Sequence, residues 1–326
     1  MIPRRLAVGL LLSLACAAAA QELDIDAEVR AALTKPLRFS NPDLAALRRG
    51  EVVAHGVPSR APGEIAVAGA VRIAAPKAAF FARVRDIARF KRGHDVLQIG
   101  RFSNPPVLDD LAALTVDRDD FDVRSCRVGD CGIRLPAAAI ERVAREIDPR
   151  APDAQARGAA LFKQILFERV TAYRSGTDGA TQYDDGSKPI RPRLEFDGIL
   201  ANMPEIGALM PAPAGGEEFL YWSKEKFGLA PFITVTHVTI ACRSAATCLM
   251  TTRDVYSSRY LDASLALVIA TDAETPGAFY LVYDNRSRAS ALKGGFGGLR
   301  RALSERRARG GLEASLKATK MLLEKD

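Results

Sequence analysis

The last third of the chain alternates between hydrophobic and polar positions in a way that is typical of β-strands. Runs rich in β-branched residues, or with a hydrophobic residue at every second position, predict strands at 232–242, 249–256, 260–270 and 279–284. In the third run Leu261, Leu265 and Leu267 fall on one face, and Phe279 and Leu281 follow in the fourth. These runs together predict an antiparallel meander with one hydrophobic face.

Elsewhere the pattern favours helices, apart from strands predicted at 64–73 and 96–99. Hydrophobic residues at helical spacing predict helices that start at Pro76 and Pro136, a longer one at 153–173, and a last one up to the chain end. The final helix has a stripe that includes Leu299, Leu303, Leu312, Leu316 and Leu323. This order predicts the α+β class. We expect a helical arm at 21–55 and a main domain at 56–326, with a helical insert around 104–175.

The first twenty residues have the pattern of a secretory signal peptide. Arg4 and Arg5 precede a hydrophobic run, and small residues lead to a cleavage site near Ala20. The protein is therefore expected to be periplasmic or secreted. A lipoprotein anchored through Cys16 is the less favoured alternative, because the leucine that usually stands three residues before such a cysteine is not there.

Composition and charge narrow the possible partners. An apolar fraction of 48% excludes a disordered chain. The net charge of +7 falls to +5 without residues 1–20, which contain two arginines and no acids. That excess permits weak attraction to anionic lipid headgroups but does not indicate nucleic acid. Candidates for such a contact are Arg300, Arg301 and the arginines at 306, 307 and 309, and a solvated helix face partly paired with Glu305 and Glu313 is the equal alternative. The familiar catalytic, metal and nucleotide motifs are missing, so no cofactor is predicted.

Four cysteines remain after the signal peptide, in two closely spaced pairs. Cys126 and Cys131 lie in CRVGDC, and Cys242 and Cys248 lie in CRSAATC at the tip of the predicted hairpin. In an exported protein such pairs favour disulfides over a zinc site, whose usual spacing differs.

The order of elements resembles the helix-grip fold of the START-like lipid-transfer superfamily. The segments that carry the resemblance are the strand at 65–73 with its following helix, YSSRYLDASLALVIATD, and YLVYDNRSR before the final helix. The resemblance implies a curved antiparallel sheet packed around the C-terminal helix, with a cavity for a hydrophobic, lipid-like ligand between them.

Candidate ligand contacts follow from this arrangement. His237 lies mid-strand, Arg253 and Tyr256 follow on the neighbouring strand, and these polar groups would orient a headgroup. Alternatively, these three side chains form hydrogen bonds or ion pairs within the protein and bind no ligand. The expected cavity walls, which could equally be filled core, are Leu261, Leu265, Leu267, Phe279, Leu281, Leu299 and Leu303.

Three functions therefore compete. The leading hypothesis is an exported protein that carries or sequesters a hydrophobic ligand. The second is an enzyme of hydrolase or cyclase type, which would need His237, Arg253 and Asp254 in one polar cavity. The third is an envelope interaction protein with a filled core. Few aromatic residues and three scattered histidines favour a binding protein over an enzyme.

Overall fold

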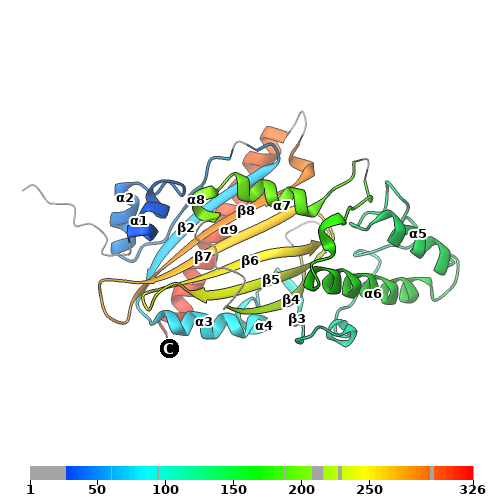
Figure 1. The fold of residues 1–326 in the computed structure, drawn as a ribbon, viewed down its shortest axis with the longest axis horizontal. Helices are drawn as coiled ribbons and strands as arrows, with labels where there is room; N and C mark the ends of the chain where they lie inside the picture. The colour runs from blue at the N-terminus through cyan, green and yellow to red at the C-terminus, as the bar shows by residue number, and fades with distance from the viewer. Residues whose placement is uncertain are drawn as a thin grey trace, which may run out of the picture.

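Eight strands of the described residues form one curved antiparallel sheet (Figure 1), ordered β1-β2-β8-β7-β6-β5-β4-β3. The computed structural model describes residues 27–59, 61–93, 95–186, 188–207, 216–226, 230–293 and 297–325, so the predicted signal peptide and Cys16 lie outside it. The strands are β1 (Val53–Gly56), β2 (Glu64–Ile73), β3 (Val96–Arg101), β4 (Glu217–Glu225), β5 (Phe232–Cys242), β6 (Thr247–Ser257), β7 (Ala263–Asp272) and β8 (Phe279–Arg288).

Helices pack on both faces of this sheet, which confirms the α+β class and the C-terminal helix. They are α1 (Ala27–Thr34), α2 (Asn41–Arg48), α3 (Lys77–Arg85), α4 (Ile87–Phe90), α5 (Ala137–Glu146), α6 (Ala154–Arg174), α7 (Pro192–Ala201), α8 (Pro204–Gly207) and α9 (Gly297–Leu323). No helix among the described residues has the length and hydrophobicity that a membrane crossing requires.

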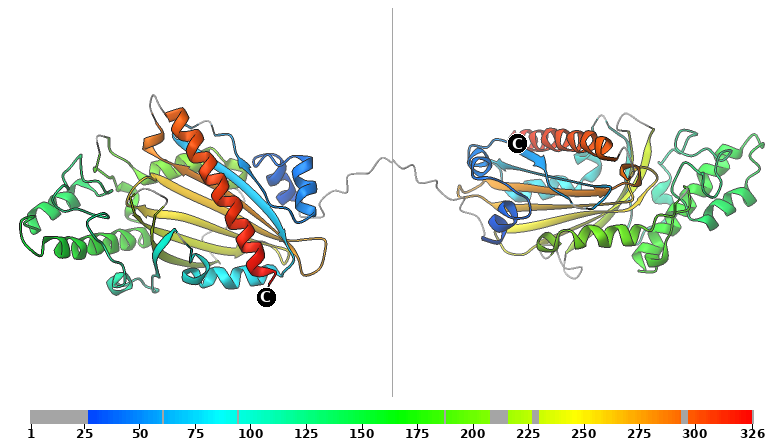
Figure 2. Two further views of the ribbon diagram at one scale, coloured as in Figure 1. Left: turned by 180° about the vertical axis from the view of Figure 1, so that it is seen from behind. Right: turned by 90° about the horizontal axis from the view of Figure 1, so that it is seen from above.

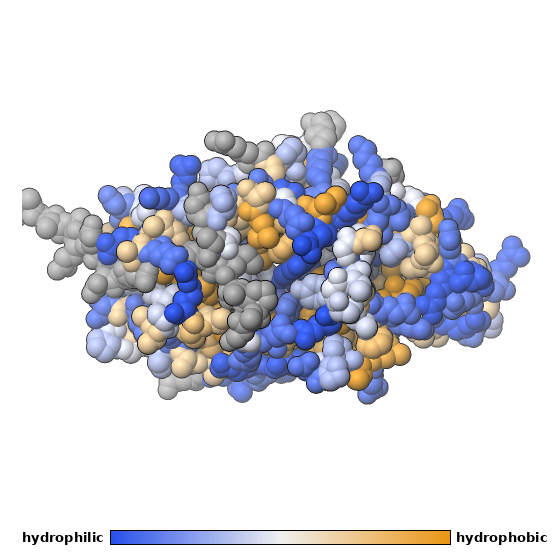
Figure 3. All heavy atoms as spheres, viewed as in Figure 1, coloured by the Kyte–Doolittle hydropathy of each residue, from blue (hydrophilic) through white to orange (hydrophobic). Residues whose placement is uncertain are grey.

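The two faces of the sheet have different coverings. The face that we call the α9 face packs against α3 and α9 (Figure 2), with a core that includes Val67, Val268 and Met250. The opposite face, called the α7 face, packs against α1 and α7 through residues such as Leu265 and Val282. Seen from the α7 side, hydrophilic residues separate small hydrophobic patches at the surface (Figure 3).

Helix α9 lies directly on β2, with little space between them. Its buried residues Leu312 and Leu316 point at Gly69 in the middle of that strand. A Cβ atom on Gly69 would lie 2.8 Å from Leu316 Cδ1 and 3.0 Å from Leu312 Cδ2, so only glycine permits this close approach. This part of the interface is packed core.

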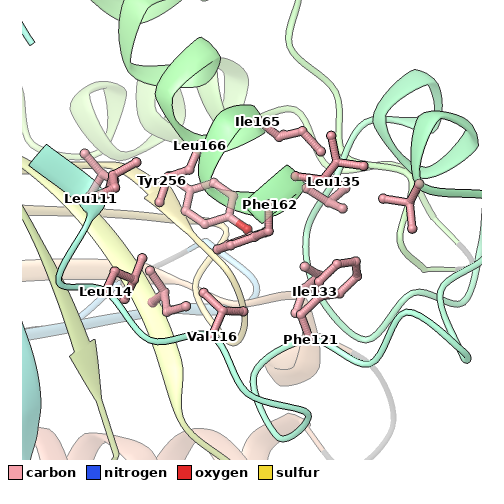
Figure 4. Close-up of a cluster of buried hydrophobic side chains, with 14 of the residues drawn as sticks. Leu111, Leu114, Val116, Phe121, Ile133, Leu135, Phe162, Ile165, Leu166 and Tyr256 are labelled. Carbon is pink, nitrogen blue, oxygen red and sulfur yellow. The ribbon is translucent and has the colours of Figure 1, made fainter. Parts of the chain in front are cut away.

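The segment between β3 and β4 forms a lobe whose hydrophobic cluster also includes side chains of the sheet (Figure 4). Leu111, Phe121 and Phe162 are buried there against Tyr256 of β6. Trp222 of β4 belongs to the same cluster and donates its indole N–H to the carbonyl of Asp110 at 2.8 Å. The insert is therefore anchored on the α7 face at the ends of the central strands.

Disulfides join both predicted cysteine pairs. Cys126 is bonded to Cys131, and Cys242 is bonded to Cys248. The second pair closes the β5–β6 hairpin, in which these two residues face each other in register. Structural disulfides are typical of proteins in oxidising compartments, which is consistent with an extracytoplasmic protein.

Candidate ligand-binding site

The predicted polar residues lie on the α7 face, away from α9. His237 of β5 and Arg253 of β6 are cross-strand neighbours in register. The Arg253 guanidinium stacks on the ring of Phe196 in α7, 3.7 Å from its centroid, and also faces Tyr173 of α6. Asp254 points to the other face, because adjacent strand residues alternate. The structure thus does not gather His237, Arg253 and Asp254 into one cavity.

His237 is held by two partners. Tyr173 Oη lies 2.8 Å from His237 Nδ1, and Glu218 Oε2 lies 3.1 Å from Nε2. Burial lowers the pKa of His237, although the nearby Glu218 carboxylate opposes that effect. A neutral ring that accepts from Tyr173 and donates to Glu218 satisfies both contacts. This matches the alternative interpretation of a hydrogen-bonded histidine on a half-buried strand.

Tyr256 lies beside a cavity of about 330 Å³ between α5 and α6. Its walls are mostly apolar and include Phe162 and Ile165. Two of its polar groups already have partners: Tyr256 donates to the carbonyl of Arg134, and Arg169 pairs with Asp178 at 3.0 Å. The cavity is therefore a mainly apolar space.

The predicted wall residues do not line one cavity. Leu265 and Leu267 are buried on the α7 face, whereas Phe279 and Leu281 are buried in the core of the α9 face. Leu261 precedes β7 in a loop, and its carbonyl accepts a hydrogen bond from Arg134. The α9 residues Leu299 and Leu303 point outward, with 67% and 55% of their surface exposed. The alternation along each strand was predicted, but the face on which each residue lies was not.

On the α9 face, the central strands carry a second set of polar residues that remains accessible. Tyr283 and its alternate neighbours on β8, together with residues of β6 and β7, are only half-buried although their strands lie inside the sheet. We call this set the open stretch: Thr252, Asp254, Ser264, Tyr283, Asn285 and Ser287. The half-buried apolar residues Ile65, Ile99 and Ala308 lie on the same face, from β2, β3 and α9.

Asp254 supplies the carboxyl group of the open stretch. Thr236 Oγ1 donates to its Oδ1 at 2.9 Å, and burial raises its pKa to about 7 despite this hydrogen bond and the positive charge of Lys91. At neutral pH the group therefore exists in both protonation states. It can donate a hydrogen bond in one state and accept in the other.

A lysine–glutamate pair lies beside Asp254. Lys91 Nζ is 2.7 Å from Glu225 Oε1 and also donates to Tyr221 Oη at 3.3 Å. Burial alone would lower the pKa of Lys91, but Tyr221 and Glu225 outweigh it and raise the pKa. Ser223 donates to the same Glu225 oxygen at 2.6 Å. Because Lys91 and Glu225 neutralise each other, the local charge is set by Asp254.

Tyr283 supplies a hydroxyl in the same region. Burial raises its pKa to about 12, with smaller effects from Lys91, Tyr221 and Asp254, so its phenol stays protonated at physiological pH. Within the part of the chain that the structure describes, its hydroxyl has no protein hydrogen-bond partner. Tyr283 and protonated Asp254 can therefore both donate to a neutral oxygen of a ligand. No group of metal-binding side chains occurs among the described residues.

The sequence contained a signal for this site. Tyr283, Asn285 and Ser287 recur with a period of two in YLVYDNRSR, so polar residues alternate with residues of the other face in a central strand. That period identifies the β8 residues of the open stretch. It does not reveal that residues of β6 and Lys91 lie beside them. Comparisons with protein-family models, with curated proteins and with solved structures found no match.

Proposed function

We propose that this is an exported protein that binds a hydrophobic, lipid-like molecule on the α9 face, for carriage or sequestration. The single observation that carries the proposal is the open stretch, where central strands keep accessible side chains beside α9. Asp254 and Tyr283 would bind a neutral hydroxyl or carbonyl oxygen, while Ile65, Ile99 and Ala308 would contact the apolar part. Each buried Å² of apolar surface contributes about 25 cal/mol.

The topology supports this proposal. Strand β2 is followed by α3 and α4, then by β3, by the strands β4 to β8 and by α9, and β2 lies next to β8 in the sheet. This arrangement is compatible with the helix-grip fold of START-like proteins, in which the ligand lies between sheet and C-terminal helix. The α9 face is the corresponding face here, which supports a ligand site on that face and not at His237.

The test is stoichiometric binding together with identification of the ligand. The protein would be purified without denaturation, its bound molecules extracted with organic solvent and identified by mass spectrometry. The delipidated protein would then be titrated with the fluorescent probe N-phenyl-1-naphthylamine. We expect one co-purifying lipid-like species and one saturable probe site. A native protein without any bound lipid, and without saturable probe binding, would refute the proposal and favour an interaction protein with a filled core.

Two variants locate the site. Thr252→Phe places a large side chain on the open stretch, and Ala139→Phe fills the 330 Å³ cavity beside Tyr256. We expect the first to reduce probe affinity at least tenfold and the second to leave it unchanged, with both variants folded by circular dichroism. The opposite result would move the site to the cavity between α5 and α6.

A second candidate function uses the same site for catalysis. A carboxyl with a pKa of about 7 is suited to proton transfer at neutral pH, and Asp254 has that property. An enzyme would lose turnover of its substrate in Asp254→Asn while the variant still bound the molecule extracted from the native protein. If the extracted molecule returns chemically unchanged after incubation with wild-type protein, binding alone is the function.

A further inference from the structure

Helix α9 has an outward face that combines exposed hydrophobic residues with unpaired basic ones. Leu299, Leu303 and Met321 are 67%, 55% and 56% exposed. With 3.6 residues per turn, these three side chains fall within about 40° of one another around the helix. The buried residues Leu312, Leu316 and Leu323 are on the opposite side and hold the helix to the sheet. The outward leucines therefore do not stabilise the fold.

The charge on this helix has one sign. Helix α9 contains seven basic and two acidic residues, a net charge of +5. Arg306 and Arg307 flank Leu303 on the outward side and are exposed. Neither of them, nor Arg309, forms an ion pair with any residue that the structure describes. Glu305 lies on the inward side against Gly56, and Glu313 is paired with Lys317 at 2.6 Å, so little acidic charge opposes the outward arginines.

We propose that the outward face of α9 docks the protein on an anionic phospholipid membrane. The arginines contact lipid phosphates while Leu299 and Leu303 enter the boundary between headgroups and acyl chains. Positive charge alone fits any acidic polymer, but exposed leucines between arginines match a membrane surface, which offers charge and an apolar layer together. The helix lies flat on its sheet, so it can lie along a membrane without any change in the fold. This proposal does not depend on the ligand proposed above.

The test measures partitioning to vesicles. Purified protein is sedimented with sucrose-loaded vesicles of phosphatidylcholine containing about one-third phosphatidylglycerol, and with phosphatidylcholine alone, at 0.1 M salt. We expect binding to the anionic vesicles only, and release in 1 M salt because the charge is screened. Arg306→Gln with Arg307→Gln should weaken binding roughly 25-fold, since each basic residue contributes about fivefold near an anionic surface.

Two further variants separate lipid insertion from charge attraction. Leu299→Ser with Leu303→Ser keeps every charge and should still weaken vesicle binding at least tenfold. The matched control combines Leu97→Ala and Arg118→Gln, an exposed leucine and arginine far from α9 in sequence, and should bind like wild type. Absence of binding to anionic vesicles would overturn the proposal. So would undiminished binding of the leucine variant, which would instead indicate an acidic macromolecule as the partner.

Discussion

The carboxyl of Asp254 should make the stability of this protein depend on pH. An aspartate in an unfolded chain has a pKa of about 3.9, whereas burial raises the pKa of Asp254 to about 7 in the folded protein. At about pH 2.5 and below, the group is protonated in both states and costs nothing. As the pH rises towards 7, the carboxyl ionises in the unfolded chain but stays protonated in the folded protein. The free energy of unfolding therefore falls. Above pH 7 the loss is complete.

The magnitude follows from the two pKa values. Their difference corresponds to about 4 kcal/mol at pH 8, and to about 1.5 kcal/mol at pH 5. Solvent contact at the half-buried carboxyl makes these upper limits. Asp254→Asn stays neutral and avoids the cost. The substitution should therefore stabilise the protein by up to about 2–3 kcal/mol more at pH 8 than at pH 5.

Urea denaturation followed by circular dichroism at the two pH values measures this difference. Asp109→Asn, at an exposed position, is the control and should give the same small effect at both pH values. Thr236→Val removes the hydroxyl that donates to Asp254 and should raise the pKa of Asp254 further. If Asp254→Asn changed the free energy of unfolding equally at pH 5 and pH 8, the carboxyl would not be buried as the structure places it, and the reasoning would fail.

Three other predictions concern packing and charge elsewhere. Gly69→Val should destabilise the protein by about 1–3 kcal/mol in urea denaturation, because its side chain would collide with Leu316 at 2.8 Å; an unchanged midpoint would show that α9 moves freely. Lys224→Met should lower the free energy of unfolding by about 3–5 kcal/mol, because Asp120 would lose the buried cation now 2.5 Å away. A smaller loss in the double variant with Asp120→Asn would confirm the pairing. His237, whose pKa burial lowers, should titrate by NMR with a midpoint below 6.5, and a higher midpoint would contradict its buried setting.

Strand β4 shows why part of the fold was missed from the sequence. The predicted meander begins at β5, but Glu217–Glu225 forms a further full strand before it. Three successive polar residues, Ser223, Lys224 and Glu225, end that strand and are all buried. Lys224 is neutralised by Asp120 of the insert, and Glu225 by Lys91 after α4. Because these partners are more than 100 residues away, no local pattern can show that such residues belong in a sheet.

Strand β1 was missed for a different reason. It has only four residues, all half-buried, and pairs with β2 at the edge of the sheet. So short a segment has too few positions to show a period of two. The long strands and helices that were predicted have their own hydrophobic pattern over ten or more residues, and this explains why β2, the β5–β6 hairpin and α6 were found.

The candidate site depends on which face of the sheet is left uncovered, and alternation alone cannot decide that. In β6, Arg253 and Asp254 are adjacent in sequence and both half-buried, yet the first packs against Tyr173 of α6 and Phe196 of α7 while the second lies on the α9 face. Both faces carry buried hydrophobic residues, so neither is identified by hydrophobicity. Helix α9 packs mainly on β1 and β2, at one edge of the sheet, whereas the open stretch lies on β6, β7 and β8. The location of the open stretch thus follows from where the last helix packs, which is a long-range property of the chain.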